Sequence, residues 1–288
     1  MSSRDALQTA RARVRGKAAA LKHRIVRPDA GSSDGCLVCR APRSPYRELT
    51  YEDQSSLVRS VSVCSGCGYV AIEELPGDRY RTKKSLDELP GAGTRIGTAD
   101  RPGREYRMTR MALDILDRNA VEVMIYGIGR SLDNRHIAGL PRVSNVAIGD
   151  IMKLRDDAEF HDANQPATKR FPIVVASEVV EHFRNPREDF AKLFNFVARD
   201  GLLVCGTNVY DGGDLTKDRY IYFPDHTSYY TPRALLEIAR INHYKLDFRT
   251  PRLALPGGRK RYVLFTRSPD VLQRVALYFG TRTVAPSE

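Results

Sequence analysis

A glycine-containing loop between two apolar segments constrains the fold of this chain most strongly. The segment Val121–Ile125 is strand-like, and the loop that follows, residues 126–131, reads Tyr-Gly-Ile-Gly-Arg-Ser. A helical stretch and a second apolar run, Val143–Ile148, come next and end in Gly149-Asp150. Strand, glycine loop, helix, strand and acid, in this order, indicate the first βαβ unit of a nucleoside-binding α/β domain. The glycines allow the backbone to approach a ligand, and the acid can accept hydrogen bonds from a ribose.

Beyond this unit, helical and strand-like segments alternate up to residue 267. The predicted elements are a helix at 105–118, a buried strand at 171–177, a helix from Asn185-Pro186 to Gly201 with Val197 on its apolar stripe, a strand at 202–206, a helix from Thr231-Pro232, and strands at 245–249 and 262–267. This alternation predicts a doubly wound, mostly parallel sheet with helices on both faces. Ligands in such sheets bind at the carboxyl ends of the strands. That edge would collect Gly127, Asp150, Asp162, Glu178, Glu181, His182 and Asn208.

Four of the five cysteines form two C-x-x-C pairs, Cys36/Cys39 and Cys64/Cys67. Two such turns can complete a tetrahedral Cys₄ zinc site, and we predict a small structural zinc ribbon. Two disulfides or a redox pair are the alternatives. Disulfides are disfavoured because the chain shows no secretion signal, and a redox motif needs one pair only. Since all four ligands would come from the protein, the zinc would have a structural role. We expect Cys205, in an apolar strand, to be a buried hydrophobe.

The positive charge is concentrated at the N-terminus. Residues 1–30 hold eight Lys or Arg and two Asp, so this arm carries more than half of the net charge of +11. We expect a solvated terminal helix; contact with anionic lipid, RNA or an acidic partner is the alternative. No apolar run reaches bilayer length, which excludes a transmembrane helix and favours a cytoplasmic protein. The predicted boundaries are an arm at 1–30, a zinc ribbon at 31–80, a linker at 81–104, the α/β domain at 105–267 and a tail at 268–288.

Taken together, these motifs resemble the class I S-adenosylmethionine-dependent methyltransferases, whose fold is Rossmann-like with a seven-stranded type of sheet. The landmarks are the Gly127–Gly129 loop, Asp150, Phe160-His-Asp162-Ala, Ser177-Glu-Val-Val-Glu-His182 and Asp200-Gly-Leu-Leu-Val. The Cys₄ module in front resembles that of bacterial methyltransferases acting on sugar nucleotides and other small metabolites.

The resemblance implies a role for each of these residues. Gly127, Gly129 and Ser177 would bind the cofactor, with the two glycines beneath its methionine part. Asp150 would take the ribose hydroxyls and Asp162 the adenine amino group. The sequence departs from the family where the acid before the loop is replaced by Ile125, and where Ser131 stands at the third small position of the loop. The cofactor's amino group then needs another partner, or its affinity is weak, or the fold is a binding scaffold.

Glu178, Glu181 and His182 would share one face if their segment were helical. Similar E-x-x-E-H motifs in ubiquinone-type O-methyltransferases and small-RNA 2′-O-methyltransferases are associated with a divalent metal, which here would be Mg²⁺ or Mn²⁺. His226 precedes the next helix as in the RNA enzymes. The alternative is that His182 or His226 alone acts as a general base, or that the glutamates cap the helix and line the pocket.

We therefore expect a methyltransferase acting on a small hydroxylated metabolite, such as a sugar or sugar nucleotide, by O- or C-methylation with a His base. An RNA 2′-O-methyltransferase is the second interpretation, supported by a pI near 9.5 and by Arg259-Lys260-Arg261. Against it stands the concentration of charge in the arm. A third interpretation is a non-catalytic scaffold, suggested by Ile125 and Ser131.

Overall fold

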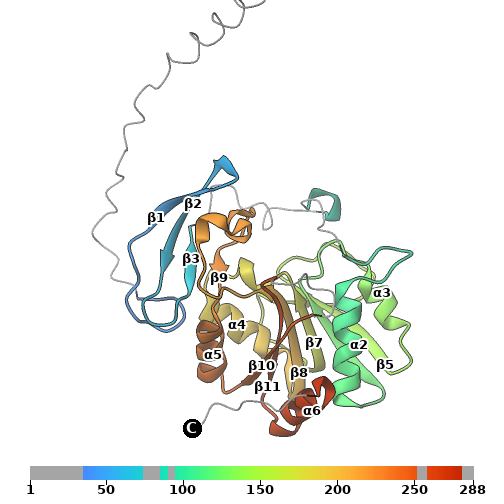
Figure 1. Ribbon diagram of the computed structural model, residues 1–288. Helices are drawn as coiled ribbons and strands as arrows, with labels where there is room; N and C mark the ends of the chain where they lie inside the picture. Colours follow the sequence, from blue (N-terminus) through green and yellow to red (C-terminus); the bar gives the residue numbers. More distant parts are fainter. Residues whose placement is uncertain (1–34, 74–84, 90–94, 252–257, 281–288) are drawn as a thin grey trace, which may run out of the picture. The chain divides into compact units, whose positions relative to one another are not determined.

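The main sheet has the predicted doubly wound arrangement (Figure 1). The computed structural model describes residues 35–73, 85–89, 95–251 and 258–280. In spatial order the seven strands are β10 (Lys245–Arg249), β11 (Lys260–Thr266), β8 (Val197–Asn208), β7 (Phe171–Ser177), β4 (Val121–Tyr126), β5 (Val143–Asp150) and β6 (Glu159–Asp162). Strands β4 to β8 pair in parallel, whereas β11 is antiparallel to both β8 and β10. The chain moves outward from β4 to β5 and β6, then returns to β7 on the other side of β4. The β4/β7 junction is therefore the switch point where such folds bind ligands.

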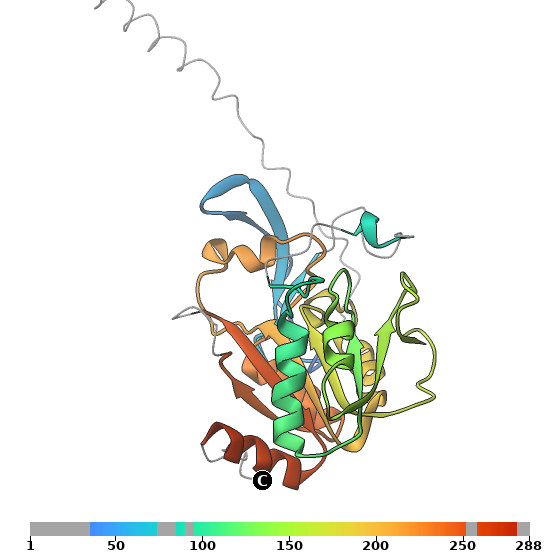
Figure 2. The ribbon, with the colours of Figure 1, turned by 90° about the vertical axis from the view of Figure 1, so that its right-hand side faces the viewer.

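Helices cover both faces of this sheet. They are α2 (Arg104–Leu116), α3 (Asp133–Ala138), α4 (Pro186–Asn195), α5 (Pro232–Ile241) and α6 (Pro269–Phe279). The side chains of strand β7 alternate between the two faces of the sheet. Ile173 and Val175 belong to the core beneath α2 and α6, and Val174 and Ala176 belong to the core beneath α4 and α5. Figure 2 looks onto the face on which α2 lies. Each fully buried aliphatic side chain stabilises this sandwich by roughly 1.5–3 kcal/mol.

Two boundaries differ from the sequence-based expectation. The helix that begins at Asn185-Pro186 ends at Asn195, and Val197 is the first residue of β8, where it pairs with Phe171. Val197 is buried in either arrangement, so apolar spacing alone could not separate a longer helix from a longer strand. Residues 269–279, within the predicted tail, form α6, whose Val271 and Val275 pack in the same core as α2.

The cysteine module contributes most of a second sheet. Strands β1 (Arg47–Tyr51), β2 (Gln54–Val63) and β3 (Val70–Ile72) are antiparallel, and β9 (Ser228–Tyr229) pairs with β3 at its edge (Figure 1). Strand β9 comes from the segment between β8 and α5. That segment also holds the short 3₁₀ turns η3 (Leu215–Lys217) and η4 (Arg219–Tyr222). Because the module and the α/β domain share a sheet, the described residues form one compact unit.

Parts of the predicted division lie outside the described residues. These are the arm at 1–30, residues 31–34 and 74–80 of the predicted zinc ribbon, residues 81–84 and 90–94 of the linker, residues 252–257 of the α/β domain and residues 281–288 of the tail. The linker residues that the structure describes include the 3₁₀ turn η1 (Leu86–Glu88) and residues 95–103. Residues 95–103 are hydrogen-bonded to the end of the glycine loop. The Gly97 amide donates to the Ser131 hydroxyl, and the Leu132 amide donates to the Gly97 carbonyl. Among the described helices, none is long and apolar enough to cross a membrane.

Candidate functional site

The four predicted zinc ligands meet at one point. The Sγ atoms of Cys36 and Cys67 lie 3.6 Å apart, those of Cys39 and Cys64 lie 3.4 Å apart, and all four lie within 4.8 Å of one another. Tetrahedral zinc with Zn–S bonds of about 2.3 Å requires S···S separations of roughly 3.8 Å. All four cysteines are free thiols, so the disulfide alternative is not realised. Backbone amides of Val38 and Gly66 donate to Cys36 and Cys64, as expected of thiolates in such turns.

Hydrogen bonds join this module to the α/β domain beside its two C-x-x-C turns, the knuckles Cys36–Cys39 and Cys64–Cys67. The Thr231 hydroxyl donates to the Cys67 carbonyl and accepts from the Ala234 amide, so one side chain both holds the second knuckle and caps α5. The hydroxyls of Tyr69 and Ser228 lie 2.6 Å apart in the buried interior. The cysteine module thus packs against the segment that carries β9.

The glycine loop has the shape expected for close approach to a ligand. Gly127 and Gly129 have φ angles of +68° and +54°, which favour glycine. A Cβ on Gly127 would lie 2.6 Å from a methyl of Val179, which follows β7, so the β4 and β7 loops are in contact. A Cβ on Gly129 would meet nothing within 4 Å. There is therefore open space above Gly129 at the switch point.

Asp150 and Asp162 lie side by side in register at the carboxyl ends of β5 and β6. Burial raises the pKa of Asp150 to about 6, against the opposing effect of the backbone amides of Ile151 and Met152. Asp162 accepts from the backbone amide and the side chain of Asn164, which stabilises the turn after β6. Asp162 therefore has a structural role, and its contact with the adenine amino group stays a prediction.

The residues at which the loop departs from the family pattern are both buried. Ile125 packs in the core beneath α2 and has no exposed surface. The Ser131 hydroxyl donates to the Glu105 carboxylate at 3.1 Å. Burial, together with the nearby Asp133, raises the pKa of Glu105 to about 7. Sequence patterns had not singled out Glu105, whose proximity to Ser131 depends on the packing of α2 against the loop.

The expected helical face of Glu178, Glu181 and His182 is not present. Glu178 has a left-handed backbone with φ of +56°, and only Val180–His182 form a 3₁₀ turn, η2. The Glu178 carboxylate pairs with Lys260 on β11, and so it is directed away from the helical face that the spacing implied. Ser177, just before it, is buried at the end of β7, beside Gly206. The left-handed backbone of Glu178, a non-glycine residue at a strand end, is a feature often found at functional sites.

Glu181, His182 and His226 do come together. One ligand atom from each lies within 4.8 Å of the others, and the two imidazole rings meet edge to face with centroids 5.0 Å apart. Nδ1 of His182 lies 2.8 Å from the Asp225 carbonyl, and Nδ1 of His226 lies 2.7 Å from the Tyr220 carbonyl. A carbonyl can only accept, so both rings carry their hydrogen on Nδ1 when neutral, which makes Nε2 the basic nitrogen.

Burial shifts the pKa of two of these three residues. Burial, followed by the charge of His182, lowers the pKa of His226 to about 3. Burial raises the pKa of Glu181 to about 7, although one of its oxygens accepts from the Thr207 hydroxyl. The other oxygen, Oε1, is buried without a hydrogen-bond partner. Such an orphaned carboxylate oxygen is costly in a fold unless a ligand or a proton satisfies it.

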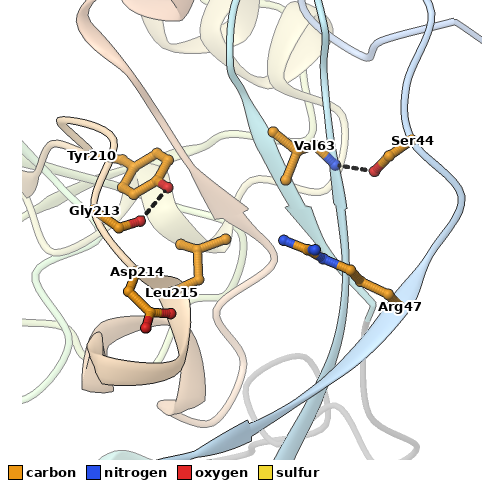
Figure 3. A pocket seen from close by; sticks show the side chains of 7 residues that line it. All are labelled: Ser44, Arg47, Val63, Tyr210, Gly213, Asp214 and Leu215. Carbon is orange, nitrogen blue, oxygen red and sulfur yellow. Dashed lines mark hydrogen bonds between the residues drawn. The ribbon is translucent and has the colours of Figure 1, made fainter.

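A cavity of about 360 Å³ lies between the cysteine module and the η3 segment (Figure 3). Its lining residues are Ser44, Arg47, Val63, Tyr210, Gly213, Asp214 and Leu215. Arg47 and Asp214 stand on opposite sides of it, and the Tyr210 hydroxyl donates to the Gly213 carbonyl. None of the sequence-predicted site residues lines it. The neighbouring Tyr229 and Tyr230 are fully buried packing residues, so of these three tyrosines Tyr210 alone lines the cavity.

The sheet order, the glycine loop at the switch point and the acids beside it define the class I methyltransferase type of α/β fold predicted from the sequence. A family model described as a methyltransferase domain matches residues 65–246, more than half of the chain. The chain therefore belongs to the methyltransferase-domain family. The predicted enzyme class, a S-adenosylmethionine-dependent methyltransferase, is confirmed by this membership.

The chain is also similar to solved structures of methyltransferases, at low sequence identity and with TM-scores under 0.5. The 1,6-didemethyltoxoflavin-N1-methyltransferase of Burkholderia thailandensis is 15% identical with a TM-score of 0.41, over 55% of this chain and 75% of that one. The N-methyltransferase NodS of Bradyrhizobium japonicum is 13% identical with a TM-score of 0.43, over 58% and 86%. An O-methyltransferase family protein of Burkholderia thailandensis is 16% identical with a TM-score of 0.42, over 57% of each chain. No curated protein sequence matches the chain.

Proposed function

We propose that this enzyme methylates an oxygen or an acidic carbon of a small hydroxylated molecule, such as a sugar or sugar nucleotide, with His182 as the general base. The observation that carries the proposal is the His182–His226 pair at the edge of the sheet that also bears the glycine loop and Asp150. The cofactor S-adenosylmethionine supplies a methyl group attached to a positively charged sulfur. The protein then has to bind, orient, exclude water and remove a proton.

The residues at the switch point fit this cofactor. The open space above Gly129 suits a ligand that passes close to the backbone. Asp150, at the end of β5, has the position of a carboxylate that accepts from ribose hydroxyls. Its neighbour Asp162 is in register on β6 and would lie beside the adenine. Ser177 would complete the cofactor side at the end of β7.

His182 suits the role of base through its tautomer. The contact from Nδ1 to the Asp225 carbonyl orients the ring and makes Nε2 the proton acceptor. His226 is the weaker base because its pKa is about 3, so we assign it to shaping the pocket around His182. Transfer of the acceptor proton to His182 would raise the nucleophilicity of the oxygen or carbon as the methyl group moves.

The walls near the histidines favour a small acceptor over RNA. The segment 209–226 carries Asp211, Asp214, Asp218 and Asp225 against Lys217 and Arg219, so it is net acidic. RNA binding depends on neutralising phosphates with basic side chains. The cysteine module, held by β9, would close the acceptor side and retain its shape through a structural zinc ion at Cys36, Cys39, Cys64 and Cys67.

Titration calorimetry with S-adenosylhomocysteine tests the cofactor assignment, and we expect micromolar binding. No heat at millimolar ligand would reject it in favour of a scaffold. A panel of sugars, sugar nucleotides and a short RNA, scored by mass spectrometry for a 14-Da gain, then tests the acceptor class. Methylation of RNA alone would reject the small-molecule proposal.

A divalent cation at Glu181, His182 and His226 is the second candidate for the chemistry. The orphaned Oε1 of Glu181 and two imidazoles in one tautomer are the observations that favour it. Backbone carbonyls that orient ligating imidazoles are typical of metal sites. A bound Mg²⁺ or Mn²⁺ would lower the pKa of an acceptor hydroxyl. Turnover lost on EDTA treatment and restored by Mg²⁺ or Mn²⁺ would favour the cation; turnover indifferent to EDTA would leave His182 as the base.

A further inference from the structure

The amino-acid end of the proposed cofactor carries an α-ammonium and an α-carboxylate, and the glycine loop itself offers no acid. Residues 125–131 are Ile, Tyr, Gly, Ile, Gly, Arg and Ser. A positively charged ligand group in a partly buried crevice needs a carboxylate or several carbonyls. A carboxylate partner for the ammonium would therefore have to come from another element that packs against this loop.

Two buried carboxylates lie beside Ser131 at the end of the loop. Asp133 is used for structure: its Oδ1 accepts from the Gly103 amide at 2.6 Å and its Oδ2 from the Tyr106 amide at 3.1 Å, which caps the start of α2. Glu105 is the second. Its Oε2 accepts from the Ser131 hydroxyl, and its Oε1 lies 3.0 Å from Nε of Arg104. Glu105 thus places a carboxylate at the loop that lacks one.

A lysine at the same edge of the sheet lies within electrostatic range of Glu105. Lys260 begins β11 and is in register with Asn208 at the carboxyl end of β8. It pairs with Glu178, which follows β7 at the same edge. Burial lowers the pKa of Lys260 far below its ordinary value, Arg104 lowers it further, and the charge of Glu105 opposes this effect. The ends of β7 and β8, the start of β11 and the start of α2 therefore carry one acid and one base, and the charge of the acid influences the pKa of the base.

We infer that Glu105 and Lys260 are the two halves of the binding site for the cofactor's amino-acid end, with Glu105 taking the α-ammonium and Lys260 the α-carboxylate. This inference rests on the proposed function. Glu105 on α2 would replace the acid that Ile125 does not supply, and the Ser131 hydroxyl would orient its carboxylate toward the loop. The bound zwitterion would take the places of Arg104 and Glu178 as the charge partners of Glu105 and Lys260. The net charge of the site would not change.

A bound ligand would compensate for the cost of burying these ionic groups. Buried ionic groups contribute little to stability when they only pair with each other, because desolvation offsets their attraction. A zwitterionic ligand gains from the same groups, since it brings the opposite charge to each and finds both side chains already oriented. The arrangement spans α2, β7 and β11, so it belongs to the sheet edge and not to one local motif.

The affinities of three ligands, measured by calorimetry or fluorescence titration, test the roles of Glu105 and Lys260 separately. S-Adenosylmethionine carries both charged groups, decarboxylated S-adenosylmethionine carries the ammonium only, and 5′-methylthioadenosine carries neither. In Glu105→Gln we expect about 10- to 100-fold weaker binding of the first two ligands and unchanged binding of methylthioadenosine. In Lys260→Met we expect a similar loss for S-adenosylmethionine alone.

The matched controls are Glu122→Gln and Lys169→Met. These residues form an ion pair of 2.6 Å at the opposite end of the sheet, and they should leave all three affinities unchanged. Methylthioadenosine binding also reports that each variant is folded. Equal losses for all three ligands, or no loss in either variant, would overturn the inference and assign the cluster to structure. Failure of the unmodified protein to bind any of the three would overturn the proposed function itself, and with it this inference.

Discussion

His182 and His226 lie edge to face, with ring centroids 5.0 Å apart and each Nδ1 against a backbone carbonyl. They come from different segments: His182 follows β7, whereas His226 precedes β9. Glu181 completes the group, and its other neighbour is Thr207 near the end of β8. The group therefore exists only when both segments are packed against the edge of the sheet.

The first prediction concerns His182. His182→Asn keeps a donor that can reach the Asp225 carbonyl but removes the basic nitrogen. We expect turnover to fall by about 100- to 10,000-fold, because general-base catalysis contributes about this much. The affinity for S-adenosylhomocysteine should stay within about twofold, since cofactor binding is assigned to other residues. Steady-state kinetics with the acceptor from the panel and calorimetry measure the two effects.

His243→Asn is the control for this substitution. His243 is exposed at the end of α5, and its left-handed backbone, with φ of +58°, tolerates Asn. It should leave turnover unchanged. An equal loss in both variants, or full activity in His182→Asn, would contradict the role of His182 as base.

The second prediction concerns Asp150 and pH. Its pKa of about 6 lies above the ordinary 3.8 because of burial. The ionised carboxylate can accept from both ribose hydroxyls, so S-adenosylhomocysteine should bind more tightly as pH rises from 5 to 7. Asp150→Asn should weaken binding at pH 7 by about 10- to 100-fold and should flatten the pH profile. Calorimetry across this pH range measures both effects.

The Asp150 carboxyl should also affect the stability of the fold. Its contribution to stability should fall as pH rises, whereas ligand affinity should increase. Between pH 3.8 and about 6 the folded protein holds a proton on Asp150 that the unfolded chain has lost. The contribution of Asp150 to the free energy of unfolding therefore falls as pH rises through this window. Asp156→Asn, at an exposed residue paired with Lys153, is the control and should change neither profile. A profile for Asp150→Asn as steep as that of the unmodified protein would reject the assignment.

The third prediction concerns metal content. The protein should hold about one zinc per chain, and Cys36→Ser should lose it, since three thiolates and a hydroxyl bind zinc weakly. Thermal stability should fall with the metal because the knuckles share the hydrophobic core with α4 and α5. Cys205→Ala, in the buried strand β8, should lower stability without changing zinc content. Elemental analysis decides the matter, and equal zinc in both variants would contradict the Cys₄ site.

The fourth prediction concerns the junction of the module and the domain. Thr231→Val removes the cap of α5 and the bond to the Cys67 carbonyl together. Loss of a cap costs about 1–2 kcal/mol, and loss of the second bond about 1 kcal/mol more. Ser268→Ala removes only the cap of α6 and should cost less. Thermal unfolding compares them, and zinc release to a chelator should be faster in Thr231→Val alone. Equal release rates would show that Thr231 does not hold the knuckle.

Much of the fold could be predicted from the sequence because its signals are local. The alternation of apolar strands with amphipathic helices, the glycines of residues 127–129 and the acid at 150 each depend on neighbours within a few turns of chain. Their order allows few topologies, and the observed sheet has the expected class. The end of α4 was misplaced because Val197 is buried as either a helical or a strand residue.

The candidate site was predictable in part. The spacing of the cysteines is a local signal, and the four thiols converge as expected. Glu178, Glu181 and His182 follow β7 as expected, but their segment is not helical, so the condition for a shared helical face is not met. Glu178 has a left-handed backbone and pairs with Lys260, a residue distant in sequence, and no local spacing encodes such a contact.

The sequence by itself determined the class of protein, a βαβ-based sheet of the nucleoside-binding type preceded by a Cys₄ module. Backbone propensities, apolar periodicity and ligand spacing determine it because they are properties of short stretches. The tertiary structure alone decided that β9 joins the cysteine module to the domain, that Glu105 reaches Ser131, and that His226 meets His182. These contacts arise when distant segments bury apolar surface together, and the polar groups left at their edges must then find partners in space.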